Sequence, residues 1–495
     1  MLESWAGINY FRNKNYGEII LSISISFICN NQLVQASLHP ATTVLDFLRK
    51  HLKLKGTKEA CREGDCGACT ILVGELNNEN VSYRSVNSCL LPLGSINGKH
   101  IVTIEGINQK ELNVIQSSLL DEGGTQCGFC TPGFIMSMTG YFLNSHDYNL
   151  NDLVTSLDGN ICRCTGYASV KRAAQKITGV MNDSNPAGES RVEYLVKRGI
   201  LPEYFLHIPN RLKEIAGGKN KPYKEAVNST NFIAGGTDLF AKDAERLLEV
   251  ELKFLGRQKE KPLVWNKDNL CFINASATVS DIQNSELLQK IFPGIKNYFN
   301  SFGSLPIRNN ATIGGNIVNA SPIGDSIIFF LVLNARLFLS SENLNREVPL
   351  KNFYRGYKNI DKNNEEVLNY ISFDIPEENG YFNFEKVSKR TYMDIATVNS
   401  AIYAEVKDGV IMHINISAGG VASVPMLLEK TCDYLINKNI TAEHIKNAAV
   451  ISQSEISPID DVRGSAGYKR LLLRQIIFAH FVKLFPVYVN VKELI

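Results

Sequence analysis

The distribution of cysteine constrains this chain more than any other feature of the sequence. Eight of the eleven cysteines lie between Cys61 and Cys164, and only Cys29, Cys271 and Cys432 fall outside that segment. Disulfide frameworks are typical of small secreted domains, whereas thiols confined to one segment of a longer chain favour metal ligation. The sequence therefore predicts a metal-binding region in the first third of the chain.

Length and composition set broad limits. The chain has 495 residues, which predicts about three domains rather than one core. Its 44% hydrophobic and 21% charged residues are typical of a folded globular protein. The formal net charge of +2 gives no reason to expect nucleic acid or an anionic membrane as a partner.

No secretory or membrane segment is expected near the N-terminus. The most apolar run there, residues 19–29, alternates serine with branched residues, which is typical of a strand, and it is too short to cross a bilayer. The run has neither the basic start nor the small-residue cleavage site of a signal peptide. We therefore expect a cytoplasmic location.

The first four clustered cysteines have the spacing of an iron–sulfur site. Residues 61–69 read CREGDCGAC, and the set follows the C-x4-C-x2-C…C pattern of plant-type [2Fe–2S] centres: Cys61, Cys66, Cys69 and Cys89. Gly64 and Gly67 let the loop bend sharply and bring backbone N–H groups near the sulfurs. Zinc is the alternative, but zinc sites usually pair two C-x2–4-C knuckles. The spacing favours a [2Fe–2S] cluster.

The second set of cysteines combines the motifs CGFC and CRC. It comprises Cys127, Cys130, Cys162 and Cys164. CGFC alone is also typical of a thioredoxin-like redox pair, which requires a βαβ surround. Here each motif is expected to open a helix, so that two helix N-termini direct positive dipole ends at an anionic cluster. The arrangement favours a second [2Fe–2S] centre, while Cys29 and Cys271 are expected to be buried, inert thiols.

Hydrophobic periodicity divides the chain into a β-rich start, a helical segment and a mixed remainder. Strands are expected at 18–29, 32–39, 70–74 and 100–105, with one helix at 43–54. Further helices are expected at 134–143, 150–157 and 167–180. The polar stretch 182–191 has the composition of an interdomain linker. Toward the C-terminus, strands at 401–406 and 411–416 alternate with helices at 442–451 and 468–484.

Two glycine-rich loops lie in the middle of the chain. Residues 232–239 read FIAGGTDL, and residues 308–325 read RNNATIGGNIVNASPIGD. Paired glycines let backbone N–H groups approach a pyrophosphate. Neither loop is the G-x-G-x-x-G fingerprint, so a Rossmann fold is not indicated. From the pattern alone, an ordinary tight turn fits each loop equally well.

Six motifs, taken in their order along the chain, resemble the xanthine dehydrogenase (molybdenum hydroxylase) family: CREGDCGACT, CGFCTPG, DGNICRCTGY, AGGTDL, ATIGGNIVNASPIGD and DVRGSAGYKR. The resemblance implies an α+β multidomain fold. Its expected parts are a β-grasp plant-type ferredoxin domain at 18–106, a four-helix [2Fe–2S]-binding domain at 107–181, a linker at 182–205, a PCMH/VAO-type FAD-binding domain at 206–378 and a CO-dehydrogenase-flavoprotein-like domain at 379–495.

In that family, electrons pass from a molybdenum centre through two [2Fe–2S] clusters to FAD and then to NAD⁺ or oxygen. The resemblance implies that the cluster nearer molybdenum is held by Cys127, Cys130, Cys162 and Cys164, and the one nearer FAD by Cys61, Cys66, Cys69 and Cys89. It also implies FAD contacts along both glycine loops and at three further positions. These residues are Phe232, Ile233, Ala234, Gly235, Gly236, Thr237, Asp238, Leu239, Thr312, Ile313, Gly314, Gly315, Asn316 and Asp325, with Phe302, Leu368 and Lys386.

Five other positions match weaker family features. Tyr357 resembles a residue near the nicotinamide site, although a surface tyrosine fits nearly as well. Arg390 and Asp394 match a polar motif at the edge of the flavin domain, for which an interdomain salt bridge is the alternative. Asp461 and Arg463 belong to a motif that is expected to cap a helix rather than to act in catalysis.

The resemblance implies a role in electron transfer, with no catalytic residue on this chain. The molybdopterin domains of the family need more chain than follows residue 484, so we expect them on a partner polypeptide. The sequence is similar to the small FeS–FAD subunit of a split bacterial xanthine dehydrogenase, an α2β2 heterotetramer. In that enzyme, oxidation of hypoxanthine and xanthine to urate is coupled to reduction of NAD⁺.

Two other classes stay open. An FeS–FAD subunit of another molybdenum hydroxylase, acting on aldehydes or N-heterocycles, would carry the same motifs. A non-enzymatic zinc or scaffold protein with structural glycine turns would be colourless, with zinc and no flavin.

Overall fold

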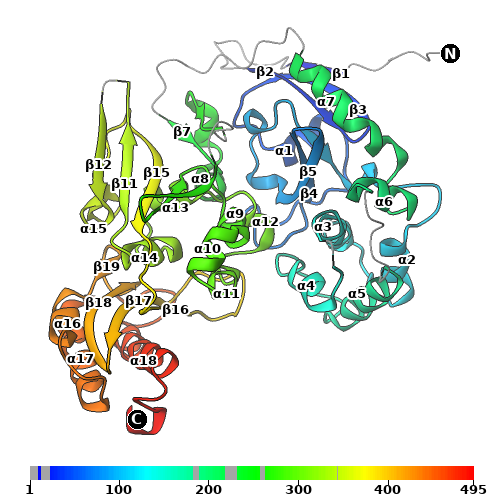
Figure 1. The fold of residues 1–495 in the computed structure, drawn as a ribbon. Coiled ribbons are helices and arrows are strands. Elements are labelled where there is room, and N and C mark those ends of the chain that lie inside the picture. The colour runs from blue at the N-terminus through cyan, green and yellow to red at the C-terminus, as the bar shows by residue number, and fades with distance from the viewer. Residues whose placement is uncertain are drawn as a thin grey trace. The chain divides into compact units, whose positions relative to one another are not determined.

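The computed structural model describes residues 9–12, 23–145, 147–181, 189–217, 231–256, 262–342 and 344–494. They fall into two units, Met1–Phe254 with Ser304–Asn310, and Leu255–Gly303 with Ala311–Ile495. Each unit combines helices and sheets (Figure 1), as the predicted α+β class requires. Among the described residues, no helix has both the length and the apolar character needed to span a membrane.

A six-stranded mixed sheet with the order β1-β3-β2-β6-β4-β5 supports the first unit. Its strands are β1 Asn9–Arg12, β2 Ile23–Cys29, β3 Gln32–Leu38, β4 Thr70–Asn77, β5 Asn80–Asn87 and β6 His100–Val102. Two antiparallel hairpins, β2–β3 and β4–β5, make up most of it. Their turns place Asn30 and Asn78 in the left-handed conformation, which asparagine adopts more readily than most residues.

The N-terminal predictions hold with local differences. The strand predicted at 18–29 is β2, described from Ile23, and residues 9–12 upstream of it form β1, which pairs in parallel with β3. Residues 1–8 and 13–22 lie outside the described residues. The predicted helix at 43–54 is a short α1, Val44–Asp46, followed by a π-helical turn, η1, Phe47–His51. Strand β5 was not predicted, because its sequence NVSYRSVN contains few apolar residues.

Helices form the second part of this unit. They are α2 Val114–Asp121, α3 Thr131–Asn144, α4 Leu150–Thr155 and α5 Ala168–Val180, so the three predicted helices are confirmed. Short 3₁₀ turns connect neighbouring elements at η2 Ser88–Leu90, η3 Leu93–Ser95 and η4 Ile104–Gly106. Helix α3 is central: residues 133–142 are all buried, and α3 packs against β4 and β5. Gly140 permits this close packing, since a Cβ there would lie 3.0 Å from Leu72.

The predicted linker at 182–205 is only partly a connecting segment. Residues 182–188 lie outside the described residues, but α6 Arg191–Lys197 begins at a capping box formed by Ser190 and Glu193. Tyr194 and Leu195 of α6 are buried in the same apolar core as α3. The unit continues through η5 Glu203–His207, α7 Ile208–Gly217, β7 Phe232–Ile233, α8 Thr237–Asp243, η6 Arg246–Glu249 and β8 Lys253–Phe254.

A short segment from the middle of the chain also belongs to the first unit. It is Ser304–Asn310, which contains α12 Leu305–Arg308. Arg308 forms an ion pair of 3.1 Å with Asp158, and the two side chains are only 2% and 3% exposed. The Leu305 N–H donates to the other carboxylate oxygen at 3.0 Å. Burial raises the pKa of Asp158 even though Arg308 opposes that shift.

The second unit contains two main sheets. A five-stranded sheet has the order β12-β11-β15-β10-β9, and a four-stranded sheet has the order β16-β17-β18-β19. The first consists of β9 Val264–Lys267, β10 Leu270–Asn274, β11 Arg336–Ser340, β12 Asn345–Pro349 and β15 Val367–Asp374. The second consists of β16 Gly380–Val387, β17 Val398–Lys407, β18 Val410–Gly419 and β19 Met426–Leu427. A small ribbon, β13 Tyr354–Gly356 and β14 Asn359–Ile360, stands apart from both sheets in pairing.

Helices accompany both sheets of the second unit. Near the first sheet in sequence they are α9 Val279–Asn284, α10 Glu286–Ile291, α11 Ile295–Asn300, α13 Ile313–Asn319, α14 Asp325–Leu331 and α15 Leu350–Phe353. Those that follow the second sheet are α16 Glu429–Leu435, α17 Ala442–Glu455, α18 Ala466–Leu484 and α19 Val491–Leu494. The C-terminal strands and helices predicted from periodicity are confirmed as β17, β18, α17 and α18, and α18 packs against β16 and β17.

The buried Arg308–Asp158 pair generates a stability prediction. Arg308→Met leaves the Asp158 carboxylate buried without its partner, so we expect the free energy of unfolding of the first unit to fall by about 3–5 kcal/mol. Chemical denaturation followed by circular dichroism measures the change. The double variant Arg308→Met/Asp158→Asn removes the uncompensated charge and should recover most of the loss. Arg172→Met, which breaks an exposed pair with Glu122, should cost at most about 1 kcal/mol; a similar cost for both arginines would contradict the prediction.

Candidate cluster-binding and flavin-binding sites

The first four cysteines converge as two pairs of sulfur atoms. Three of them lie in the loop that leads from η1 into β4, and Cys89 lies in η2 directly after β5. The Sγ atoms of Cys61 and Cys66 are 3.2 Å apart, and those of Cys69 and Cys89 are 3.4 Å apart. The β4–β5 hairpin brings Cys69 and Cys89 together, because one precedes β4 and the other follows β5.

Pairs of thiols suit a two-iron cluster. Each iron of a four-cysteine [2Fe–2S] cluster takes two thiolates, and two thiolates on one tetrahedral metal lie about 3.8 Å apart when the metal–sulfur bond is ~2.3 Å. A structural zinc ion instead needs four ligands around one point. The observed pairs therefore fit a [2Fe–2S] cluster better than a zinc ion.

The backbone of this loop is shaped for the cluster. Gly64 and Gly67 have φ values of +84° and +65°, which side-chain-bearing residues rarely adopt. The resulting turns direct backbone N–H groups at sulfur: the N–H of Glu63 donates to Cys61 Sγ at 3.4 Å, and the N–H of Gly64 donates to Cys89. Such hydrogen bonds stabilise thiolates and help to set a cluster's reduction potential.

Hydrogen bonding within each sulfur pair shifts the two thiol pKa values in opposite directions. The bond between Cys61 and Cys66 lowers the pKa of Cys61 to about 5 and raises that of Cys66. In the second pair, the hydrogen bond between the thiols lowers the pKa of Cys69 and raises that of Cys89. One sulfur of each pair is therefore predisposed to the thiolate form that binds metal.

The second four cysteines pair across their two motifs. Burial, together with an interaction with the Cys162 thiol, raises the pKa of Cys130, and an interaction with the Cys127 thiol raises the pKa of Cys164. Each motif thus supplies one sulfur to each pair. Cys130 is the N-cap of α3, as expected, but α5 begins at Ala168, four residues after Cys164. The prediction of two facing helix N-termini is therefore confirmed for α3 and wrong for α5.

The two sets of ligands differ in exposure. Cys69 and Cys89 are buried, whereas Cys127 and Cys164 are exposed. Three apolar side chains near the exposed pair are also unusually accessible, with exposed fractions of 44% for Phe129, 40% for Ile161 and 39% for Tyr167. Within the first set, Cys69 and Cys89 are thus enclosed while Cys61 and Cys66 are half-buried; within the second set, Cys127 and Cys164 lie at the surface while Cys162 is buried.

Backbone contacts join the two ligand loops. The N–H of Ile161 donates to the carbonyl oxygen of Cys66 at 3.0 Å, and Ile161 immediately precedes the ligand Cys162. The side-chain amide of Asn160 donates to the carbonyl oxygen of Gly67 at 3.2 Å. A Cβ on Gly67 would lie 2.2 Å from the carbonyl oxygen of Gly159, so glycine is also required there for the loops to meet.

The predicted flavin residues divide between the two units, and the first stretch lies in the iron–sulfur unit. Phe232 and Ile233 form β7, Ala234 to Gly236 form the turn, and Thr237 to Leu239 open α8. Ile233 and Phe240 belong to the same apolar cluster as the thiols of Cys69 and Cys89. Asn310 fixes the turn by donating its amide to the carbonyl oxygen of Gly235 at 2.7 Å. The first ligand set and this glycine turn therefore rest on one small core.

The second glycine stretch opens α13 in the other unit. Thr312 caps this helix, and its hydroxyl accepts from the Gly315 N–H at 3.1 Å. The two glycines of the motif differ in role. Gly314 is buried against Ala275, whose Cβ would be 2.7 Å from a Cβ at 314, whereas Gly315 is exposed. Asn316 accepts a hydrogen bond from Ser326 at the start of α14. Ile313, between Thr312 and Gly314, is fully buried.

Asp325 and Lys386, predicted separately as flavin residues, form a buried ion pair. Lys386 Nζ lies 2.7 Å from Asp325 Oδ2, with side chains 5% and 11% exposed. The ammonium group also donates to the carbonyl oxygen of Ser301, next to the predicted flavin-stacking residue Phe302. Asn399 donates to the other Asp325 oxygen at 2.6 Å. Leu368 is buried in β15, so in this structure it packs within the sheet.

The remaining predicted residues lie at the surface. Tyr357 is 68% exposed. The Arg390 N–H donates to the Asp394 carboxylate at 2.9 Å, and the two side chains form a long ion pair of 3.9 Å, so this motif closes a turn on itself. Asp461 accepts from the Arg463 N–H and pairs with Lys469 at 2.8 Å. The capping residue of α18 in that motif is Ser465.

Several residues that shape these sites were not predicted. Asn160 and Asp158 lie within DGNICRC, but the spacing of the cysteines gives no indication that these polar neighbours join the loops. Asn399 and Asn310 each complete a hydrogen-bonded group whose other members lie far away in sequence. The motif RNNATIGG did carry a signal, since a basic residue and paired asparagines beside a glycine turn are unusual in an apolar context.

Four families of protein domain match successive parts of the chain. The 2Fe-2S iron-sulfur cluster binding domain matches residues 27–93, and the [2Fe-2S] binding domain matches 103–175. The FAD binding domain in molybdopterin dehydrogenase matches 202–377, and the CO dehydrogenase flavoprotein C-terminal domain matches 384–484. With two [2Fe–2S]-binding domains and one FAD-binding domain, the chain is an iron–sulfur flavoprotein. It belongs with the iron–sulfur and FAD part of the molybdenum hydroxylase family.

Known proteins agree with this placement. The chain is 28% identical to xanthine dehydrogenase of Emericella nidulans over 481 residues, covering 84% of this chain and 35% of that protein. It is 25% identical to aldehyde oxidase 1 of Bos taurus, covering 92% of this chain and 39% of that one. The chain therefore spans little more than a third of these relatives. In fold it is similar to a chain of the carbon monoxide dehydrogenase of Hydrogenophaga pseudoflava, with a TM-score of 0.50, 24% identity, and coverage of 52% of this chain and 90% of that chain.

The buried Lys386–Asp325 pair generates a prediction about flavin binding. Lys386→Met removes the contacts to Asp325 and to the carbonyl oxygen of Ser301, so Phe302 and the start of α14 lose a common anchor. We expect the purified variant to retain less FAD per chain than the wild type, as measured by flavin absorbance after heat release. Lys389→Met is the control, because Lys389 is exposed and its described hydrogen bond is to the Val462 carbonyl oxygen. Equal FAD content in both variants would refute a role for Lys386.

Proposed function

We propose that this chain is the electron-transfer part of a xanthine dehydrogenase, active with a molybdopterin-binding partner. In this proposal, electrons from the partner's molybdenum centre enter at the second cluster, pass to the first cluster, and reach FAD and then NAD⁺. Hypoxanthine and xanthine are oxidised to urate on the partner. The support comes from the arrangement of the two ligand loops and the first flavin stretch within one unit.

One continuous series of contacts carries the proposal. The second ligand loop contacts the first through the hydrogen bond from Ile161 to the Cys66 carbonyl oxygen. The first ligand set in turn shares an apolar core with Ile233 and Phe240, which flank the glycine turn predicted to bind FAD. This sequence of contacts supports the proposed order of the centres: second cluster, first cluster, flavin.

The chain's own residues supply positions and environment rather than acid–base chemistry. The cysteines hold the irons, the Glu63 and Gly64 N–H groups stabilise ligand sulfurs, and the enclosed core excludes water from Cys69 and Cys89. When bound, the clusters carry single electrons and FAD exchanges one or two, which couples them to hydride reduction of NAD⁺. We also propose that the seventeen predicted flavin residues, among them the Asp325–Lys386 pair, contact FAD.

The exposed side of the second ligand set supports the partner. Cys127 and Cys164 lie at the surface of this unit beside Phe129, Ile161 and Tyr167. Exposed apolar side chains next to a redox centre are suited to cover by another protein surface, which would shorten the path for electrons. We propose the molybdopterin-binding partner as the protein that covers them, in an α2β2 assembly, and a cytoplasmic location, where thiols remain reduced for cluster assembly.

We propose the same domain limits that the resemblance implies. We propose a ferredoxin domain at 18–106, a helical cluster domain at 107–181, an FAD domain at 206–378 and a C-terminal domain from 379, with α6 of the intervening segment attached to the helical domain.

The second candidate function is the corresponding part of an aldehyde oxidase, which the 25% identity to the bovine protein supports. The substrate of the partner separates the two.

Cys127→Ser tests the proposed relay. Removal of one ligand should abolish the EPR signal of the second cluster and disconnect the partner from FAD. In the assembled enzyme we expect xanthine-dependent NAD⁺ reduction to be lost, while NADH-to-dye activity, which needs only the flavin, is kept. Cys432→Ser is the matched control, because Cys432 is a buried thiol whose sulfur accepts only a backbone hydrogen bond from Ile416 among the described contacts.

The outcomes separate the relay from the substrate. Unchanged xanthine turnover in Cys127→Ser would refute the assignment of the second cluster. A wild-type enzyme that oxidises aldehydes but not xanthine would favour the second candidate and leave the relay intact.

A further inference from the structure

A side-chain-bearing residue in the first ligand loop has an unfavourable backbone conformation. Arg62 directly follows Cys61 and has φ +58°, in the left-handed region that L-residues with a Cβ rarely enter. Between Cys61 and Cys69, the other left-handed residues, Gly64 and Gly67, are glycines. Arginine at position 62 therefore requires an interaction that offsets the strain.

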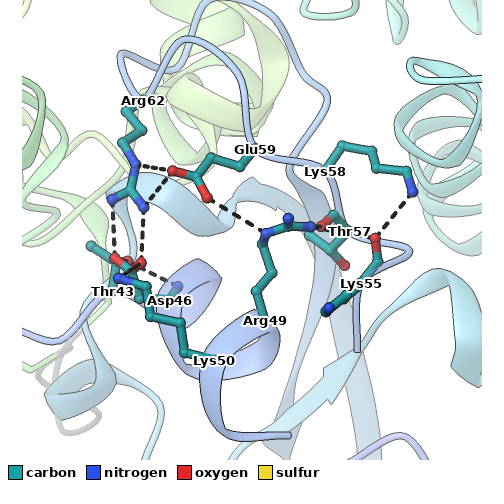
Figure 2. Close-up of polar contacts among 9 residues, drawn as sticks. All are labelled: Thr43, Asp46, Arg49, Lys50, Lys55, Thr57, Lys58, Glu59 and Arg62. Carbon is teal, nitrogen blue, oxygen red and sulfur yellow. Dashed lines mark hydrogen bonds and ion pairs between the residues drawn. The ribbon is translucent and has the colours of Figure 1, made fainter. Parts of the chain in front are cut away.

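A clamp of two carboxylates holds the Arg62 guanidinium. Figure 2 shows its two terminal nitrogens directed at Asp46, with Nη1 3.0 Å from Oδ2 and Nη2 2.8 Å from Oδ1. Its Nε donates to Glu59 at 2.7 Å. Bidentate arginine–carboxylate pairs are both stronger and more directional than single contacts. The clamp therefore restrains the orientation of residue 62 as well as its position.

Asp46 is held rigidly on the other side of the clamp. It lies in α1, where the Thr43 hydroxyl donates to its carboxylate at 2.7 Å and Lys50 pairs with it at 2.8 Å. Burial alone would raise the pKa of Asp46, but hydrogen bonds, chiefly from Arg62, hold that pKa well below its usual range. The carboxylate is thus charged at neutral pH, where the clamp persists.

Glu59 connects the clamp to the preceding turn. Its second carboxylate oxygen lies 3.5 Å from Arg49, which in turn donates to the carbonyl oxygen of Thr57 at 2.9 Å (Figure 2). Two arginines and two carboxylates thereby join α1 and η1 to residues 55–62. These charged side chains thus help to fix the base of the ligand loop.

We propose that Arg62 is a positioning residue for the first [2Fe–2S] cluster: held by Asp46 and Glu59, it maintains the left-handed turn that places Cys61 beside Cys66. These sulfurs lie 3.2 Å apart, on either side of the turn. Without the clamp, residue 62 relaxes toward a negative φ and Cys61 moves away from its partner sulfur. The inference rests on the proposed assignment of Cys61 and Cys66 as ligands.

Alanine and glycine at position 62 separate conformation from charge. Arg62→Ala and Arg62→Gly both remove the guanidinium, but only glycine enters the left-handed region without strain. With the holo-protein challenged by an iron chelator, we expect Arg62→Ala to lose the EPR signal of the first cluster faster than the wild type. Arg62→Gly should restore the wild-type rate. The second cluster, identified by its absence in Cys127→Ser, serves as the reference in the same molecule.

Every outcome decides the proposal. Equal loss in the alanine and glycine variants would assign the effect to charge and overturn it, and wild-type rates in both would overturn it as well. Asp46→Asn keeps Arg62 but weakens the clamp, so it should behave like Arg62→Ala; a wild-type rate there would contradict the role of Asp46. Arg172→Ala, which removes an exposed ion pair far along the chain, should change nothing. A wild-type chain without a first-cluster signal would instead refute the proposed function.

Discussion

The need to bring cysteine sulfurs together in pairs governs the first unit of this protein. Neighbouring thiolates repel one another unless a metal ion or a shared proton bridges them, so the backbone must hold them in place. The β4–β5 hairpin brings Cys69 and Cys89 together. A loop in which Arg62 and Gly64 are left-handed brings Cys61 close to Cys66. At the second site, sulfurs from two separate motifs pair across the start of α3. The glycines and polar residues beside these cysteines let the loops adopt the turns that bring the sulfurs together.

Burial distinguishes the roles of the two sites. Cys69 and Cys89, the buried half of the first set, share their core with β7 and α8, the elements around the first glycine turn. In the second set, Cys127 and Cys164 are exposed, which leaves this side accessible to another protein. Between the two sets, the hydrogen bond from Ile161 to Cys66 provides a short connection through the backbone. This difference in burial between the two sites suits a protein that accepts electrons at an exposed site and passes them to a buried one.

The sequence predicted which cysteines come together and where the main elements lie, because both depend on local spacing and periodicity. The C-x4-C-x2-C loop, the helices α3 to α5 and the strands β17 and β18 are each encoded within one short stretch. The tertiary partners were not predictable in this way. Asp158 and Arg308 are separated by 150 positions, and the pairing of Lys386 with Asp325 joins two residues that family resemblance had treated singly. The left-handed conformation of Arg62 could not be predicted either, because it depends on contacts with Asp46 and Glu59 that no local motif indicates.

An anaerobic reductive titration of the purified chain, followed by visible and EPR spectroscopy, tests the account most directly. With one electron per [2Fe–2S] cluster and two for FAD, the account predicts uptake of about four electrons per chain, two EPR signals and full bleaching of the flavin. Uptake of no electrons by a colourless chain that contains zinc would show that the sulfur pairs hold another metal, and would contradict the relay.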